Sequence, residues 1–256
     1  MIKKVIAGNW KMNKLFSEAD DFFDTIMEFV GDFDNLNNTE IIICPPSLYL
    51  ELATDYSIDF PVHIGAQNAS EHDFGPYTGE ISPQMLAAMG VDFSIIGHSE
   101  RRKYYHETDE VINKKLKNVL NAEITPIFCI GETLEQRENN QTKNVILSQL
   151  EKGLKDIEIY KNLYVAYEPV WAIGTGKNAT PEQAEEVHSI IRNWLENKYS
   201  KEIADSIPIL YGGSVKPENL ISLLSKQNIN GALIGGASLD VEKFMKMIKD
   251  AVKLTK

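Results

Sequence analysis

The chain has 256 residues, 43% of them hydrophobic and 25% charged, with a formal net charge of −11; this is typical of a globular protein, and the length suits one large domain. The negative charge argues against nucleic acid as a partner, and no stretch approaches the roughly 18 apolar residues that a membrane span needs. The two cysteines, Cys44 and Cys129, lie inside apolar runs and read as reduced core thiols, so we expect a cytoplasmic protein with no membrane partner.

Short apolar runs rich in Ile, Val, Tyr and Phe recur along the chain, with longer segments of helical periodicity between them. The runs are too short for helices and are typical of strands buried on both faces. In chain order the expected strands are 5–7, 41–44, 62–66, 93–96, 124–130, 163–167, 207–211 and 232–234. Eight such alternations in about 250 residues predict an α/β fold, a (β/α)8 barrel forming a single domain over residues 1–256. A doubly wound open sheet is the alternative, but no G-x-G-x-x-G motif follows the first run.

Several of the segments between the strands carry helix start signals. Thr180 and Gln183 can form a capping box around Pro181, which suits the first helical position. The pairs 82–83 and 216–217 repeat the device of a proline at a helix start. These signals predict helices beginning at the three prolines.

Chemically useful residues follow the ends of the expected strands instead of being scattered. A closed barrel brings the C-terminal ends of its strands to one face, where barrel enzymes keep their active sites. The residues concerned are Asn9, Lys11, Gln67, Asn68, His98, Glu168, 212–214 and 235–236.

Glu168 ends the sixth expected strand and is followed by a segment that is first stiff and then loose. Pro169 fixes the near end, residues 170–173 are apolar, and the glycines of 174–176 free the far end. A glutamate is usually exposed, but apolar neighbours raise the pKa of a carboxylate and suit it to general base catalysis. The segment therefore predicts a catalytic base with its own lid.

Side chains at two further strand ends can stabilise negative charge on a substrate. His98 precedes Ser99 and Glu100, which resemble the opening of a helical turn whose positive end disfavours a charged imidazole. A neutral histidine can donate a hydrogen bond to a carbonyl oxygen. Asn9 and Lys11 are two residues apart, share a face of an extended segment, and can supply an amide donor beside a cation. The other four histidines lack such a setting and are expected to be structural or exposed.

Three glycine-rich pieces, 174–176, 212–214 and 235–236, can supply backbone amides to an anion. Two of them follow strands seven and eight, where barrels commonly bind phosphate. The histidines and cysteines have no metal-binding spacing, and no nucleotide-binding loop occurs, so we expect neither a metal nor another cofactor. A base, a neutral electrophile, a cation and a phosphate grip together predict proton abstraction next to a carbonyl, through an enediolate shielded from water.

From residue 7 to residue 239 the chain resembles the triosephosphate isomerase family, and the helix expected after that fits the last helix of that family. The matching stretches are 7–11 (AGNWK), 65–68 (GAQN), 78–80 (TGE), 96–102 (IGHSERR), 166–176 (AYEPVWAIGTG), 211–215 (YGGSV) and 235–239 (GGASL).

The resemblance implies a cofactor-independent isomerase that interconverts dihydroxyacetone phosphate and D-glyceraldehyde 3-phosphate in glycolysis and gluconeogenesis. It implies that Glu168 is the base, His98 the electrophile, and Asn9 and Lys11 substrate contacts. The phosphate contacts that it implies are the amides of Gly174, Ser214, Gly235 and Gly236. Glu100 and Cys129 would have supporting roles.

The family is usually a homodimer, in which the loop after strand three reaches the partner's active site. Here that loop spans 67–80 and is long and polar, with Thr78 as the residue implied to reach the partner. The sequence departs from the family pattern at Pro76, which replaces a small residue and removes a backbone donor. Asn178 replaces a more usual threonine at the far hinge of the lid.

Other functions fit the residues less well. A pentose-phosphate epimerase should show metal-binding His and Asp at strand ends, and these are missing. A Schiff-base aldolase needs a lysine in the strand near position 168, where this chain has a glutamate. A barrel kept only as a binding or adhesion scaffold is expected to lose catalytic residues, and every implied residue is present.

Overall fold

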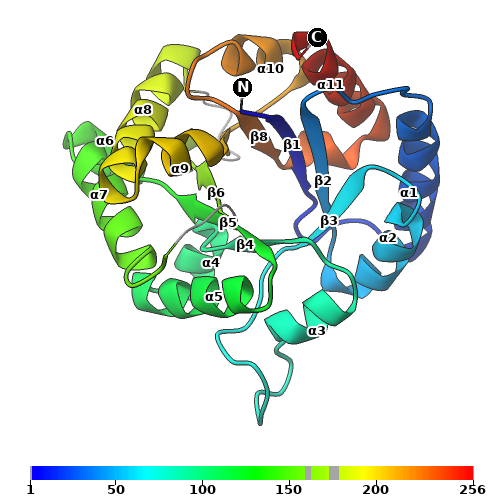
Figure 1. Ribbon diagram of the computed structural model, residues 1–256, viewed down its shortest axis with the longest axis horizontal. Helices are drawn as coiled ribbons and strands as arrows, with labels where there is room; N and C mark the ends of the chain where they lie inside the picture. Colours follow the sequence, from blue (N-terminus) through cyan, green and yellow to red (C-terminus); the bar gives the residue numbers. More distant parts are fainter. Residues whose placement is uncertain (1, 159–162, 173–178, 256) are drawn as a thin grey trace.

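Eight parallel strands close into a barrel in the computed structural model, which describes residues 2–158, 163–172 and 179–255. The strands follow one another around the barrel in chain order, and β8 pairs with β1 (Figure 1). This closure confirms the predicted (β/α)8 barrel and excludes the open sheet. The strands are β1 (Lys4–Asn9), β2 (Thr39–Cys44), β3 (Val62–Ala66), β4 (Phe93–Ile96), β5 (Thr125–Ile130), β6 (Tyr164–Tyr167), β7 (Ile209–Tyr211) and β8 (Gly231–Ile234).

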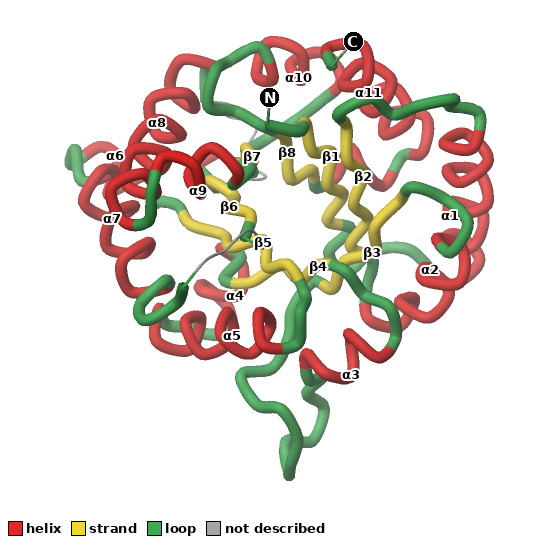
Figure 2. Tube along the Cα trace, in the orientation of Figure 1, coloured by secondary structure: helices red, strands yellow, loops and turns green. Residues whose placement is uncertain are grey.

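Helices form a ring outside the barrel (Figure 2). Those of the described residues are α1 (Phe16–Gly31), α2 (Leu50–Ser57), α3 (Pro83–Ala88), α4 (Ser99–Tyr104), α5 (Asp109–Asn121), α6 (Leu134–Glu138), α7 (Thr142–Gly153), α8 (Pro181–Lys198), α9 (Lys201–Ser206), α10 (Pro217–Leu224) and α11 (Val241–Leu254), with short 3-10 turns at Ser47–Tyr49, Val170–Ala172 and Gly236–Leu239. The three predicted starts are confirmed at Pro83, Pro181 and Pro217, and Thr180 and Gln183 form the expected capping box. No helix among these is long and apolar enough to cross a membrane.

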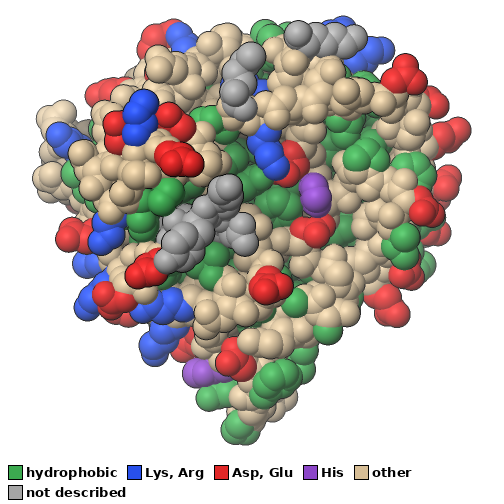
Figure 3. All heavy atoms as spheres, viewed as in Figure 1, with side chains coloured by type: hydrophobic (Ala, Val, Ile, Leu, Met, Phe, Trp, Pro, Cys, Tyr) green, Lys and Arg blue, Asp and Glu red, His purple; other side chains and the backbone are tan. Residues whose placement is uncertain are grey.

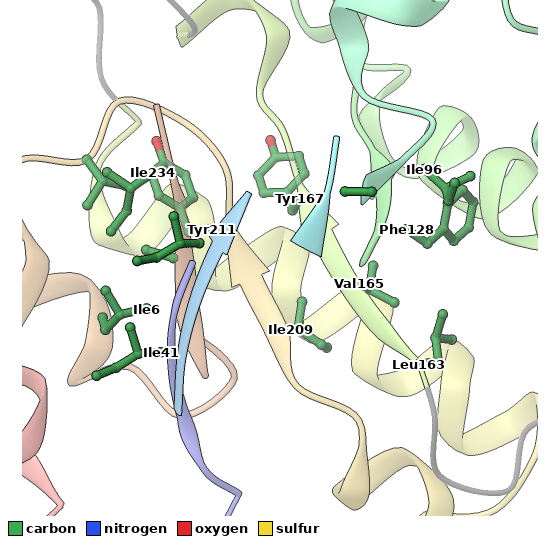
Figure 4. Packing of buried hydrophobic residues seen from close by; sticks show 14 of the residues in the cluster. Ile6, Ile41, Ile96, Phe128, Leu163, Val165, Tyr167, Ile209, Tyr211 and Ile234 are labelled. Carbon is green, nitrogen blue, oxygen red and sulfur yellow. The ribbon is translucent and has the colours of Figure 1, made fainter. Parts of the chain in front are cut away.

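Alternation of side chains along the strands divides the apolar core into two layers. One layer contains strand residues alone and fills the barrel, with Cys44 and Cys129 among its members. The other lies between the strands and the helices (Figure 4). Tyr167 and Tyr211, labelled in Figure 4, belong to this outer layer, with their ring centroids 6.5 Å apart. Because both layers consist of buried apolar side chains, the strand ends are held in a fixed arrangement on which a site can be built.

The strand register levels the C-terminal ends of β5, β6 and β7. Ile130 pairs with Tyr167, and Tyr167 pairs with Tyr211. Glu168, the residue directly after β6, is therefore held between the ends of β5 and β7. A Cβ added at Gly131 would lie 1.8 Å from the Glu168 carbonyl oxygen, so only glycine permits this approach.

Candidate active site

A cavity of about 740 Å³ opens at the C-terminal mouth of the barrel. Residues that follow β1, β4, β6, β7 and β8 line it, as expected for a barrel enzyme. Its lining includes Asn9, Lys11, His98, Glu168, Gly212, Gly213, Ser214, Lys216, Glu218, Gly235, Gly236 and Lys243.

Glu168 is almost completely buried beside this cavity, with 1% of its surface exposed. The backbone N–H of Ser99, the first residue of α4, donates to Oε2 at 2.8 Å. Nε2 of His98 lies 3.0 Å from Oε1. The Cγ of Glu168 packs against Gly212, where an added Cβ would approach to 2.9 Å. Both carboxylate oxygens are therefore oriented by groups at the start of α4, which follows β4, and β5 lies between β4 and β6.

The hydrogen bonds of His98 determine which of its ring nitrogens carries the proton. The backbone N–H of Glu100 donates to Nδ1 at 3.2 Å. An N–H can only donate, so Nδ1 is the acceptor and the proton of the neutral ring lies on Nε2. Nε2 is the nitrogen turned toward Glu168. In the neutral ring, the start of α4 thus selects the tautomer that presents an N–H to Glu168.

The pKa of Glu168 shifts in the direction opposite to our expectation. Burial acts to raise it, as predicted from the apolar neighbours, but the nearby His98 ring, the Ser99 amide and the charge of Lys11 outweigh burial and lower the pKa. Burial likewise acts to lower the pKa of His98, and the nearby carboxylates, chiefly Glu168, raise it instead. The carboxylate is therefore held ionised by specific donors, a stabilisation that the sequence neighbours of Glu168 do not reveal.

Lys11 adopts a left-handed backbone conformation, with φ of 53°, that non-glycine residues rarely occupy. Its N–H donates to Oδ1 of Asn9 at 3.1 Å, and its carbonyl accepts from Nε2 of Gln67 at 2.9 Å. Its ammonium pairs with Oε1 of Glu100 at 2.6 Å. Strain of this kind persists only where surrounding contacts hold it, so Asn9 and Gln67 fix the position from which the cation reaches the cavity.

Glycines leave open space beside this lysine. A Cβ added at Gly236 would meet nothing within 4 Å, and one at Gly235 would meet only Cε of Lys11, at 3.6 Å. Both residues line the cavity, as does Ser214 on the loop after β7. The cation and these backbone segments together border a space suited to an anionic group.

Comparisons with known proteins agree with this geometry. The family model described as "Triosephosphate isomerase" matches residues 4–251. The chain belongs to the triosephosphate isomerase family. It is 47% identical to the triosephosphate isomerase of Chloroherpeton thalassium over 98% of this chain and all of that protein, and 48% identical to that of Endomicrobium trichonymphae over 97% and 99%. The triosephosphate isomerase of Carboxydothermus hydrogenoformans is 47% identical over 98% of this chain and 100% of its own length.

Most residues that the triosephosphate isomerase resemblance singled out lie together at the C-terminal mouth. Glu100 bridges Lys11 and the His98 ring, with Oε2 lying 3.6 Å from Nδ1. Cys129 lies in the barrel interior, where burial, followed by the charge of Glu168, holds the pKa of its thiol well above the usual range. Gly174 and Asn178, and with them the glycine-rich part of the expected lid, lie outside the described residues.

Thr78 lies apart from the cavity of its own chain. The loop after β3 projects from the barrel (Figure 1), and Thr78 is exposed on it. Pro76 is accommodated beside a hydrogen bond from the Tyr77 N–H to the Gly75 carbonyl, and the Tyr77 ring stacks on His72 with centroids 3.8 Å apart. The base of the loop is tied by the Ser70 N–H, which donates to the Ile81 carbonyl at 2.8 Å.

Glu132 is a buried carboxylate beside the site that our sequence analysis did not identify. Its Oε1 accepts from Nε1 of Trp171 at 2.9 Å, from the Tyr167 hydroxyl at 3.1 Å and from Arg137 at 3.2 Å. Trp171 lies three residues after Glu168, so Glu132 holds the segment that leaves the base. The available signal was a carboxylate two residues past the end of the fifth strand.

Proposed function

We propose that the chain interconverts dihydroxyacetone phosphate and D-glyceraldehyde 3-phosphate by proton transfer through an enediolate, as one domain over residues 1–256. The observation that carries the proposal is the pairing of an ionised, buried Glu168 with the Nε2–H of a neutral His98 at an open cavity. A base and a hydrogen-bond donor this close together can serve two neighbouring atoms of one small substrate.

In the proposed reaction, Glu168 removes a proton from the carbon next to the carbonyl and returns it to the neighbouring carbon. Its carboxylate must leave the Ser99 amide and the His98 ring to reach that carbon. The Nε2–H of His98, freed from the carboxylate, then donates to the substrate oxygen that becomes negative. Lys11 and the Asn9 amide act on the same charge, which is the form of electrostatic stabilisation with the largest effects in enzymes.

The open space beside Lys11 is the proposed phosphate site. Gly235, Gly236 and Ser214 line it, and we propose that their backbone amides bind the phosphate together with that of Gly174. Glu100 orients the ammonium of Lys11, and Cys129, as a neutral thiol, supports Glu168 from below without adding charge. Such a substrate places the protein in glycolysis and gluconeogenesis, and we propose a cytoplasmic location.

We also propose that the protein works as a homodimer in which Thr78 enters the partner's active site. Large apolar side chains are exposed on loops after the four adjacent strands β1 to β4, which is unusual for a surface that remains in water. They include Met12 (95% exposed), Leu48 (81%), Phe74 (69%) and Tyr105 (67%). Sedimentation at micromolar concentration should show a dimer, and a monomer that is fully active would remove the role of Thr78.

An enzyme-linked assay with D-glyceraldehyde 3-phosphate tests the proposed reaction directly. Product should form without added metal or cofactor, and phosphoglycolate, a mimic of the enediolate, should inhibit competitively. In deuterated water, the product should carry deuterium at the carbon that receives the proton. Absence of turnover would contradict the proposal, and turnover that neither incorporates deuterium nor slows with substrate deuterated at the carbon next to the carbonyl would contradict a proton-transfer route.

A further inference from the structure

Lys11, the least exposed of the three lysines that line the cavity, is already paired. The Lys11 ammonium lies 2.6 Å from the Glu100 carboxylate. An approaching phosphate therefore meets a neutralised ion pair and the negative Glu168, on a chain whose formal net charge is −11. Attraction at a distance must come from another group near the entrance.

Two further lysines line the cavity, and their surroundings differ. Lys243 is held by Oδ2 of Asp240 at 2.6 Å, and Glu218 also lies close enough to act on its charge. Lys216 is exposed, and in the part of the chain that the structure describes no carboxylate lies within 4.0 Å of its ammonium. Lys216 is thus the cation of the cavity lining whose charge is not locally neutralised.

Lys216 is also fixed relative to the proposed phosphate site. The side chain of Asn219 accepts from the Lys216 N–H at 2.8 Å through Oδ1 and donates to the Ser214 carbonyl at 3.0 Å through Nδ2. One amide therefore holds the backbone at both residues. The next residue, Pro217, opens α10 and restricts the backbone further.

We propose that Lys216 is an electrostatic capture residue, which draws the substrate's phosphate dianion into the cavity and passes it to Ser214 and Lys11. The inference rests on the proposed function, because it assumes an anionic substrate. Lys216 acts on the encounter and makes no bond to the reacting atoms. Its effect belongs in kcat/KM and in association rates, while kcat should not change.

The size of the effect follows from Coulomb's law. A single charge about 8 Å from a dianion in water changes its encounter rate by about threefold to fivefold at low ionic strength. The effect falls as salt rises, since the Debye length is about 8 Å at 0.15 M. The change in encounter rate appears in kcat/KM to the extent that the encounter with substrate limits the reaction. Triosephosphate isomerases are a general example of enzymes near the diffusional ceiling.

The test compares K216Q with K249Q and K216R as the ionic strength is varied. Lys249 is exposed on α11 and does not line the cavity, so K249Q makes the same change of net charge away from the site. We expect K216Q to lower kcat/KM about threefold at 10 mM ionic strength, to flatten its salt dependence and to leave kcat unchanged. K249Q should match the wild type, and K216R should restore both the rate and its salt dependence.

Stopped-flow binding of phosphoglycolate gives a second measurement, in which K216Q should slow association more than it speeds dissociation. Equal salt dependence in K216Q and wild type, or an equal loss in K216Q and K249Q, would overturn the capture role while leaving the isomerase proposal standing. If the wild type binds phosphoglycolate faster than K216Q does but has no isomerase activity, the capture role would stand and the isomerase proposal would be contradicted.

Discussion

The two mouths of the barrel place charged groups in opposite ways. At the C-terminal mouth, charged side chains border an open cavity, and Lys11 is held in a strained conformation. At the N-terminal mouth, Glu40 accepts from Lys3 and from the Tyr164 hydroxyl, each at 2.5 Å, and His63 lies 3.1 Å from Asp92. Figure 3 shows the face that carries the start of the chain, with acidic, basic and histidine side chains gathered around the mouth.

The difference teaches which charges serve the fold and which serve chemistry. The N-terminal contacts join β2, β3, β4 and β6 to one another, and each group there is satisfied by a neighbour. At the C-terminal mouth, Glu168 is held by the Ser99 amide and the His98 ring, contacts that the proposed reaction exchanges for the substrate. Groups that must change partners during a reaction cannot also be the groups that bind the strands together.

The largest expected effect is the loss of activity in E168Q, which tests the C-terminal half of the comparison. An amide cannot accept the proton, so turnover should fall by about 10²–10⁴-fold, the usual size of a general base contribution. The matched control is E40Q at the other mouth, which removes the same charge from a group outside the cavity. E40Q should lower thermal stability and keep kcat within about twofold. Comparable activity in the two variants would remove the distinction between the mouths.

The pH dependence of stability should distinguish E168Q from the wild type. Because the pKa of Glu168 is lowered in the folded state, its carboxylate stabilises the fold above the unfolded pKa, and that contribution is lost as pH falls through the folded pKa. Denaturant unfolding between pH 3 and 6 should therefore show a weaker pH dependence in E168Q than in the wild type.

The next effect concerns Glu132, whose carboxylate connects the active-site segment to its surroundings. In E132Q the Oε1 position loses its charge while Trp171, Tyr167 and Arg137 still need an acceptor. We expect a loss of about 2–3 kcal/mol in stability and about a tenfold fall in kcat from misplacement of the base. Urea unfolding measures the loss of stability, and steady-state kinetics measure the fall in kcat. An unchanged kcat would show that Glu132 supports only the fold.

The fold was predictable from sequence because its signals are local. Apolar runs, capping residues and prolines act within a few neighbours, and all eight expected strands are confirmed to within a few residues of their ends. The structure also brings Asn9, Lys11, His98 and Glu168 to one cavity, as expected for residues at the ends of parallel strands, which converge in a barrel.

The features that the sequence did not predict depend on contacts between segments that are distant in the chain. The pKa of Glu168 was predicted in the wrong direction because the His98 ring first, and then the Ser99 amide 69 residues away in the chain, outweigh burial. Gln67 was read as part of a motif, but its contact with the strained Lys11 carbonyl spans 56 residues. At the N-terminal mouth, Glu40 and Asp92 have no sequence feature that separates them from ordinary surface carboxylates.

A smaller effect is expected from Y164F, which tests the structural mouth directly. The Tyr164 hydroxyl donates to Oε2 of Glu40, and its pKa is raised by burial and by that carboxylate. Removing a hydrogen bond to a charged group should lower stability by about 1.5–3 kcal/mol, measured by urea unfolding. Isomerase kinetics should be unchanged, because the barrel interior separates Tyr164 from the cavity. A fall in kcat comparable to that of E132Q would mean that the two mouths communicate.

The smallest effect is expected for His63, which should give the N-terminal mouth a pH dependence of its own. The hydrogen bond that the His63 ring donates to Asp92 raises its pKa against the lowering effect of burial. The charges of Asp92 and Glu40 act in the same direction, and Lys3 opposes them. The Tyr164 hydroxyl stays neutral and is engaged with Glu40. Since the folded pKa is raised, the stabilisation is fully present below the unfolded pKa of about 6.5 and is lost as pH rises through the folded pKa.

His63 is 43% exposed, so solvent screens the pair and the contribution should stay below about 1 kcal/mol. Unfolding measured from pH 5.5 to 8.5 should show the wild type losing this increment and H63Q lacking it, with the difference reduced in 1 M salt. The pH profile of kcat should be the same in both proteins, because His63 lies at the opposite mouth and is not among the described residues that line the cavity. Parallel stability curves would leave His63 as a packing group, and a shifted kcat profile would contradict the separation of the two mouths.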